Sequence, residues 1–72
     1  MNKYSLKVEG MMCGMCEAHV MDAVRKVVPT AKKVKASRKK NLVTFKAEEV
    51  DQELLIKTIT ETGYTASDLE IA

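Results

Sequence analysis

The sequence has no long apolar segment and no recognisable leader. Among its 72 residues no apolar run approaches the roughly 20 residues that a membrane-spanning helix needs. The opening stretch MNKYSLKVEG alternates polar and apolar residues, whereas a secretory signal has an apolar core of about 7–15 residues. We therefore expect a cytoplasmic protein without membrane insertion. A chain of this length forms one small domain, residues 1–72, with little room for both a core and a catalytic cleft, so we expect no enzyme.

Aromatic residues and chain-breaking residues are also scarce. The chain has no tryptophan, two tyrosines, one phenylalanine, one proline and three glycines. Linkers, internal repeats and low-complexity segments are absent. The net charge is only +2, and few aromatic side chains are available to stack on bases. These features argue against nucleic-acid binding.

Acidic residues are missing from the middle of the chain. Residues 23–47 contain nine lysines and arginines and no acid, whereas residues 48–72 contain seven acids and one lysine. The domain is therefore expected to carry charge of opposite sign on different parts of its surface.

Hydrophobic periodicity divides the chain into six elements. Tyr4, Leu6 and Val8 alternate with polar residues, as in a half-buried strand. A helical stripe that begins at Cys16 is expected to stop at Pro29. In chain order the expected elements are a strand at 4–8, a helix at 16–28, strands around 34–36 and at 42–47, a helix capped by Asp51 and stopped by Gly63, and a strand at 65–71. This order predicts an α+β ferredoxin-like fold, βαββαβ, with a four-stranded antiparallel sheet and two helices on one face.

This topology gathers three connections at one end of the sheet. With right-handed crossovers, the first two strands run in the same direction and the last two run back. The loop with Cys13, the turn Arg38–Asn41 and the loop with Gly63 and Tyr64 should therefore lie close together. Arg38, Lys39 and Lys40 would then form a cationic rim. A solvated hairpin is the simpler interpretation of that rim, and a docking surface for an acidic partner is the functional one.

The two cysteines are the chain's only thiols. Cys13 should lie in a loop and Cys16 in the first turn of a helix, where the partial positive charge of the helix end favours thiolate. Two thiolates suit a soft ion of low coordination number, such as Cu(I), whereas a closed zinc site needs four ligands. The pair therefore predicts an exchangeable metal ion.

Other side chains around the cysteines could widen the ligand set. His19 follows Cys16 by three residues, so the two are neighbours on a helix surface. As a third ligand His19 would favour Zn(II) or another ion with three or four ligands, and the simpler alternative is a half-exposed histidine beside the core. Met12 and Met15 could offer weak thioether ligands to Cu(I), although loop packing is the simpler role for both.

The segment GMMCGMC, Gly10 to Cys16, resembles the G-M-x-C-x-x-C motif of heavy-metal-associated domains. The resemblance extends over nearly the whole chain, from the first strand to Gly63-Tyr64. It implies a ferredoxin-like fold, Cys13 and Cys16 as metal ligands, and Met11 as a core residue beneath the loop. It also implies that Tyr64 lies beside the metal loop, as in bacterial copper chaperones. His19 departs from the usual family pattern.

The function predicted on this basis is that of a Cu(I) metallochaperone that delivers its ion to a metal-transporting P-type ATPase. Alternatives are a carrier or sensor for Zn(II), Cd(II) or Hg(II), and a metal-binding module of a larger transporter. A thiol oxidoreductase is disfavoured because Cys13-Gly14-Met15-Cys16 lacks the proline and the preceding tryptophan of thioredoxin-like motifs. We expect a monomer, with a metal-bridged dimer as the alternative.

Overall fold

The computed structural model describes residues 2–12 and 14–71, and no helix within these residues is long and apolar enough to cross a membrane. Six elements follow one another in the predicted order. They are β1 (Asn2–Glu9), α1 (Gly14–Val27), β2 (Lys32–Ser37), β3 (Leu42–Ala47), α2 (Gln52–Glu61) and β4 (Thr65–Ile71).

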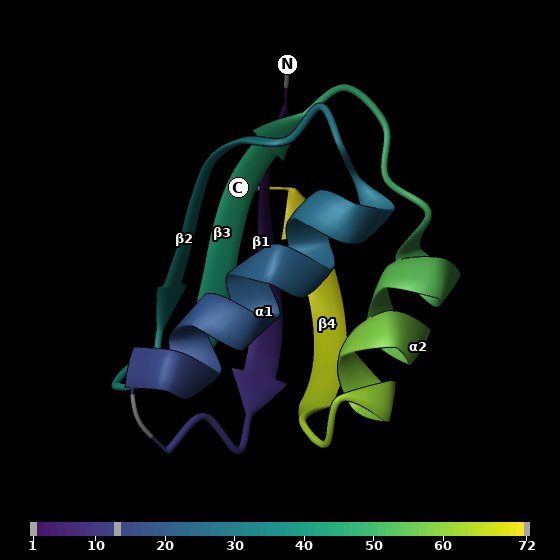
Figure 1. Cartoon of the computed structure of the whole chain (residues 1–72). Coiled ribbons are helices and arrows are strands. Elements are labelled where there is room, and N and C mark those ends of the chain that lie inside the picture. Colours follow the sequence, from purple (N-terminus) through teal and green to yellow (C-terminus); the bar gives the residue numbers. More distant parts are fainter. Residues whose placement is uncertain (1, 13, 72) are drawn as a thin grey trace.

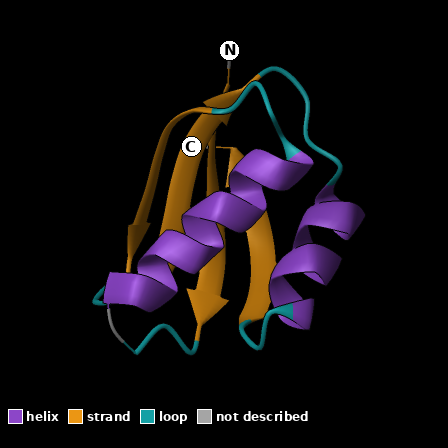
Figure 2. Cartoon of the chain, viewed as in Figure 1, coloured by secondary structure: helices purple, strands orange, loops and turns teal. Residues whose placement is uncertain are grey.

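The four strands form one antiparallel sheet in the order β2-β3-β1-β4. Both helices lie on the same face of this sheet, and the opposite face is left without a covering element (Figures 1 and 2). The predicted ferredoxin-like architecture is confirmed.

The core lies between the sheet and the two helices. Alternate residues of β1 and β3 point into it, and Tyr4 stacks on Phe45 with ring centroids 5.5 Å apart. The helices add Val20, Val24 and Leu55, each with no exposed surface. The alternating apolar residues of the strands and the apolar stripes of the helices thus pack into one continuous core.

The helix and turn signals are where the sequence predicted them. The Asp51 side chain accepts a hydrogen bond from the Leu54 amide at 3.1 Å, which caps α2. Gly63 after α2 has φ +102° and Asn41 in the β2–β3 turn has φ +55°. Both positive values are conformations that glycine and asparagine adopt at low cost.

Two irregularities in the sheet were not predicted. Lys33 and Asp68 have positive φ angles of 52° and 55°. Each lies within a register shift, in β2 between Lys32 and Lys35 and in β4 beside the β1 segment Ser5 to Lys7. The alternation of apolar residues carries no information about these bulges, because they are set by the pairing with the neighbouring strand.

Candidate metal centre

Cys16 is the third residue of α1 and therefore lies in its first turn, as predicted. Its side chain is half-buried and packs against the core cluster. Cys13, the other predicted ligand, lies outside the described residues. The sulfur of Cys16 is thus held by the packing of α1 on the sheet, at the helix end whose partial positive charge favours thiolate.

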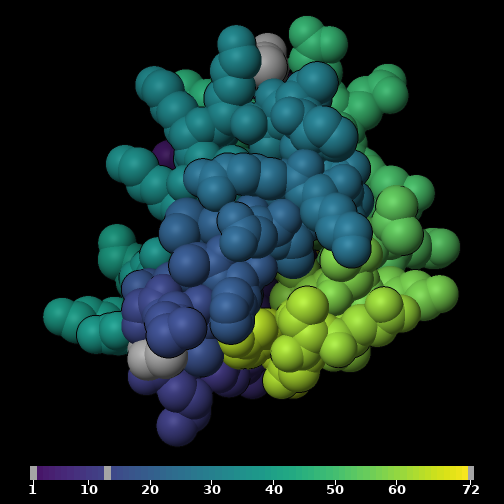
Figure 3. Space-filling view, in the orientation of Figure 1, coloured from purple at the N-terminus to yellow at the C-terminus, as the bar shows by residue number. Residues whose placement is uncertain are grey.

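Three methionines around the motif differ sharply in exposure. Met11 is 6% exposed and belongs to the core cluster, whereas Met12 is 85% and Met15 is 70% exposed. Figure 3 shows the purple segment after β1 projecting from the lower edge of the molecule. One methionine therefore fixes the loop to the core, and two present thioether side chains to solvent.

Tyr64 lies beside Gly10, the first residue of the motif. A Cβ atom built on Gly10, which has φ +97°, would be 3.6 Å from Cδ1 of Tyr64. The tyrosine is half-buried and packs against the core. The α2–β4 connection therefore meets the β1–α1 connection, as the topology predicted (Figure 1). A role of Tyr64 toward the metal remains a prediction.

The β2–β3 turn lies at the same end of the molecule and is hydrogen-bonded to α1 and β1. The Arg38 amide donates a hydrogen bond to Oε2 of Glu17 at 2.8 Å, and the Val8 amide donates to the Asn41 carbonyl at 2.8 Å. A Cβ atom on Gly14 would be 3.9 Å from Nη1 of Arg38. The guanidinium group of Arg38 therefore lies close to Gly14, the first residue of α1.

Glu17 is a site residue that the sequence interpretation missed. It lies directly after Cys16 in the first turn of α1, and its carboxylate ties that turn to the β2–β3 turn. An acidic residue in the first turn of a helix is a known stabilising signal. That signal was present in the sequence, but only the fold shows that the partner amide comes from residue 38.

The predicted cationic rim lies at this end of the fold. Arg38, Lys39 and Lys40 are all exposed, and the Lys40 amide donates to Oγ of Ser37 at 3.3 Å. The rim is therefore placed where it could meet a partner that approaches the motif loop, although docking itself remains a prediction.

His19 is exposed and faces the groove between the helices. It lines a hollow of about 240 Å³ with Asp22, Ala23, Lys26, Thr58 and Thr62. In residues 2–12 and 14–71, no group of three or more His, Cys, Asp or Glu side chains is placed to hold a metal ion. The ligand role of His19 stays a prediction.

The donor chemistry of this end of the fold suits a soft ion. Its candidate donors are thiol and thioether sulfurs, the ligands that soft metals select. A guanidinium and a helix N-terminus lie at the same end, and both favour anionic sulfur. Such a site can hold a metal ion and leave it open to an incoming ligand.

Comparison with known proteins points to the binding of heavy-metal ions. The family model of the heavy-metal-associated domain matches residues 5–65. A mercuric reductase of Lysinibacillus sphaericus is 34% identical over 71 residues, which amount to 97% of this chain and 13% of that protein. The chain thus spans only a small part of the length of this curated relative.

Two solved structures share both the fold and part of the sequence. The N-terminal domain of ZntA in its Zn(II) form has a TM-score of 0.84 and 25% identity, covering 99% of this chain and 96% of that chain. A copper binding domain from HMA7, a P-type ATPase, has a TM-score of 0.77 and 26% identity, covering 100% of this chain and 95% of that chain. These relatives are described with different metals, so the fold does not select the ion.

Proposed function

The chain belongs to the heavy-metal-associated domain family, a family of metal-binding and non-catalytic modules, and we propose that its cargo is Cu(I), held by Cys13 and Cys16. The observation that carries this proposal is the position of Cys16 in the first turn of α1, at the end of the fold that exposes Met12 and Met15. With Cys13 three residues earlier, two sulfurs can meet one ion. Two thiolates satisfy Cu(I), which accepts low coordination numbers.

The proposed transfer is a stepwise exchange of thiolate ligands. A cysteine of the partner loses its proton and its sulfur bonds to the ion, which gives a three-coordinate intermediate. One sulfur of this chain then leaves and can take up a proton, and a second exchange completes the transfer. No electron moves, and the number of metal–sulfur bonds is restored at the end.

The proposed partner is a metal-transporting P-type ATPase or its metal-binding domain. The likeness to a copper binding domain of such an ATPase supports this choice. The exposed cations Arg38, Lys39 and Lys40 would attract an acidic surface and orient it toward the thiolates. Such steering weakens as ionic strength rises, because salt screens exposed charges over about 10 Å at 0.1 M.

Metal competition on the reduced protein tests the proposal. Cu(I) and Zn(II) are titrated separately against calibrated chelators, with wild type, Cys13→Ser, Cys16→Ser and His19→Ala compared. We expect one Cu(I) per chain. In either serine variant the dissociation constant for Cu(I) should rise by more than about a hundredfold. Loss of a residue that only supports a metal ligand already lowers metal affinity about 10–100-fold, and loss of a ligand itself should cost more. His19→Ala should match wild type, and Cu(I) binding unaffected by both serine variants would overturn the proposal.

A second candidate function is a carrier for a divalent soft ion, with His19 as a further ligand. The 34% identity to part of a mercuric reductase and the likeness to a Zn(II)-form domain favour it. The same titration decides between the two, because this function requires Zn(II), Cd(II) or Hg(II) binding that weakens in His19→Ala. A module of a longer transporter would give the same metal-binding result as a separate chaperone.

A further inference from the structure

The face of the sheet that no helix covers carries a concentration of lysines. Tyr4, Leu6 and Val8 point into the core, so Lys3 just before Tyr4 and Lys7 between Leu6 and Val8 point to the open face. In β3 the same alternation puts Thr44 and Lys46 on the open face. The uncovered face is therefore polar and, over β3 and its neighbours, cationic.

The pairing of the strands places like charges directly opposite one another. Lys3 is the register partner of Lys46, and Lys46 is also paired with Lys32 across the other edge of β3. Directly opposed like charges destabilise a sheet. Two lysines at the centre of the sheet are thus held together by the fold at a cost.

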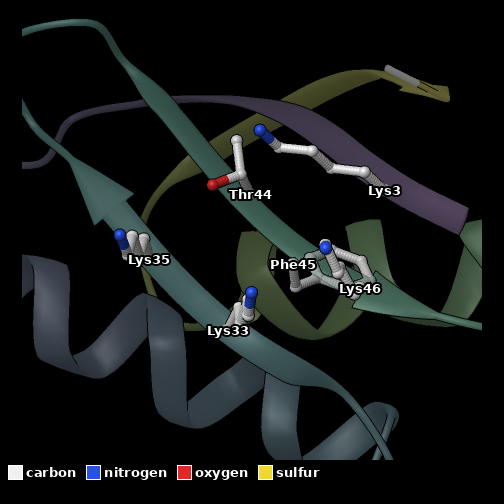
Figure 4. A pocket seen from close by; sticks show the side chains of 6 residues that line it. All are labelled: Lys3, Lys33, Lys35, Thr44, Phe45 and Lys46. Carbon is white, nitrogen blue, oxygen red and sulfur yellow. The ribbon is translucent and has the colours of Figure 1, made fainter. Parts of the chain in front are cut away.

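An irregular backbone brings a further lysine to the same place. Lys33 has φ 52°, a conformation that side-chain-bearing residues seldom adopt. It lies in the register shift between Lys32 and Lys35, and a bulge of this kind re-aims a side chain. In Figure 4, Lys33 and Lys35 project from β2 on the same side as Lys3 and Lys46.

These side chains surround a shallow hollow of about 200 Å³. Its lining residues are Lys3, Lys33, Lys35, Thr44, Phe45 and Lys46. Figure 4 shows the lysine side chains spread around this part of the sheet face, with the Thr44 hydroxyl on the side of Lys3 and Lys35. An adjoining hollow of about 350 Å³ adds Lys40 and Ser37 to this surface. No acidic residue is among the described residues that line either hollow.

The four lysines of the hollow also lack a carboxylate partner within the described part of the chain. The ion pairs found there are Lys7 with Glu9, and Arg25 with Asp22. The Phe45 ring is only 1% exposed and belongs to the core, so it offers no surface on which a base could stack. The hollow thus supplies positive charge and a hydroxyl donor without an aromatic platform.

We propose that this hollow binds a compact ligand that carries several phosphate groups. Four ammonium groups can each donate hydrogen bonds to phosphate oxygens, and Thr44 adds a hydroxyl. A ligand of high charge density would relieve the repulsion between Lys3 and Lys46. The site lies on the sheet face and is distinct from the motif loop, so it does not depend on the metal.

Acidic residues at the other edge of the open face limit the size of the ligand. Glu70 is paired with Ser5, and Glu9 with Thr65, so both glutamates share the face with Lys3. A broad anionic surface such as a bilayer would meet these carboxylates as well as the lysines. The charge pattern therefore favours a small oligophosphate over a membrane or a nucleic-acid duplex.

Binding of inorganic triphosphate to the full chain tests the proposal. The dissociation constant is measured by calorimetry, and the site is mapped by amide chemical shifts. We expect shifts at Lys3, Lys35, Thr44 and Lys46. Lys3→Gln and Lys46→Gln should each weaken binding about fivefold, as expected for removal of one nearby charge. Lys7→Gln is the matched control, because Lys7 shares the face but pairs with Glu9, and it should bind as wild type.

Reversing the charge of Lys46 distinguishes a loss of binding from a loss of stability. In Lys46→Glu the new carboxylate would face Lys3 across the strands, so the midpoint of urea unfolding should rise while triphosphate binding is lost. Shifts located at the Arg38–Lys40 turn instead of the hollow would overturn the proposal. So would equal effects of the Lys7 and Lys46 variants, or binding to phosphatidylglycerol vesicles or duplex DNA but not to triphosphate.

Discussion

Met11 and Met12 are neighbours in the chain, but their side chains lie in opposite environments. Met11 is 6% exposed and packs with the core cluster, whereas Met12 is 85% exposed. The flexible thioether side chain of methionine fills irregular gaps in a core. One residue therefore supports the motif loop from beneath, and the next is available to a metal or a partner.

Substitution of the two methionines should separate these roles. Met11→Ala removes a buried side chain and should lower the free energy of unfolding by about 2–4 kcal/mol. Met12→Ala should change it by less than about 0.5 kcal/mol. Urea denaturation of both variants measures the difference. Met11→Leu, which nearly conserves volume, should recover most of the loss, and equal stability of the two alanine variants would refute the assignment.

The ends of the elements set the geometry of the end of the fold that carries the motif. Gly63 follows α2 with φ +102°, and this conformation directs the chain into the loop with Tyr64. Gly14 opens α1 and lies under the Arg38 guanidinium. One glycine thus lies within the motif and the other at the start of the neighbouring connection, and of these two only Gly63 needs the freedom of a residue without a Cβ atom.

Alanine at the two positions should therefore have different effects. Gly63→Ala meets no atom within 4 Å, so its cost is backbone strain, about 1–2 kcal/mol of unfolding free energy. Gly14→Ala, whose Cβ atom would have its nearest neighbour at 3.9 Å, should be neutral or stabilise by up to about 1 kcal/mol. Thermal unfolding of the pair checks this, and a Gly63→Ala variant as stable as wild type would contradict it.

At the scale of the whole molecule, three connections meet at one end of the sheet, away from the start of β1 and the end of β4 (Figure 1). The hydrogen bond from the Arg38 amide to Glu17 joins the β2–β3 turn to the first turn of α1, and Gly10 lies close to Tyr64 in the α2–β4 connection. The exposed Met12 and Met15 extend it into solvent. An ion bound there would be reachable by a second molecule.

This accessibility predicts how metal supply controls association. With one Cu(I) per chain we expect a monomer in sedimentation experiments, because two thiolates satisfy one ion. With half an equivalent, two chains can share an ion through four cysteines and sediment as a dimer. Cys13→Ser should abolish the dimer. A dimer that forms without metal would show that other surfaces drive association.

The order of elements and the core were predictable from the sequence. Alternation identified β1 and β3, and helical spacing identified the buried faces of α1 and α2, because burial of apolar side chains leaves a period in the sequence. Asp51, Asn41 and Gly63 marked turns and caps through their local backbone preferences. These features depend on near neighbours in the chain, which a sequence records directly.

The tertiary structure decided what depends on distant residues. The hydrogen bond from Arg38 to Glu17 joins residues 21 positions apart, and the opposition of Lys3 to Lys46 follows from strand pairing. The bulge at Lys33 has no signature in hydrophobic periodicity. The sequence by itself determined the elements, the core and the motif, since these follow from local preference and burial. The element order also predicted that the three loops meet, but only the fold decided which side chains in them touch and which charges oppose one another, because strand register and bulges bring together residues whose separation along the chain carries no such information.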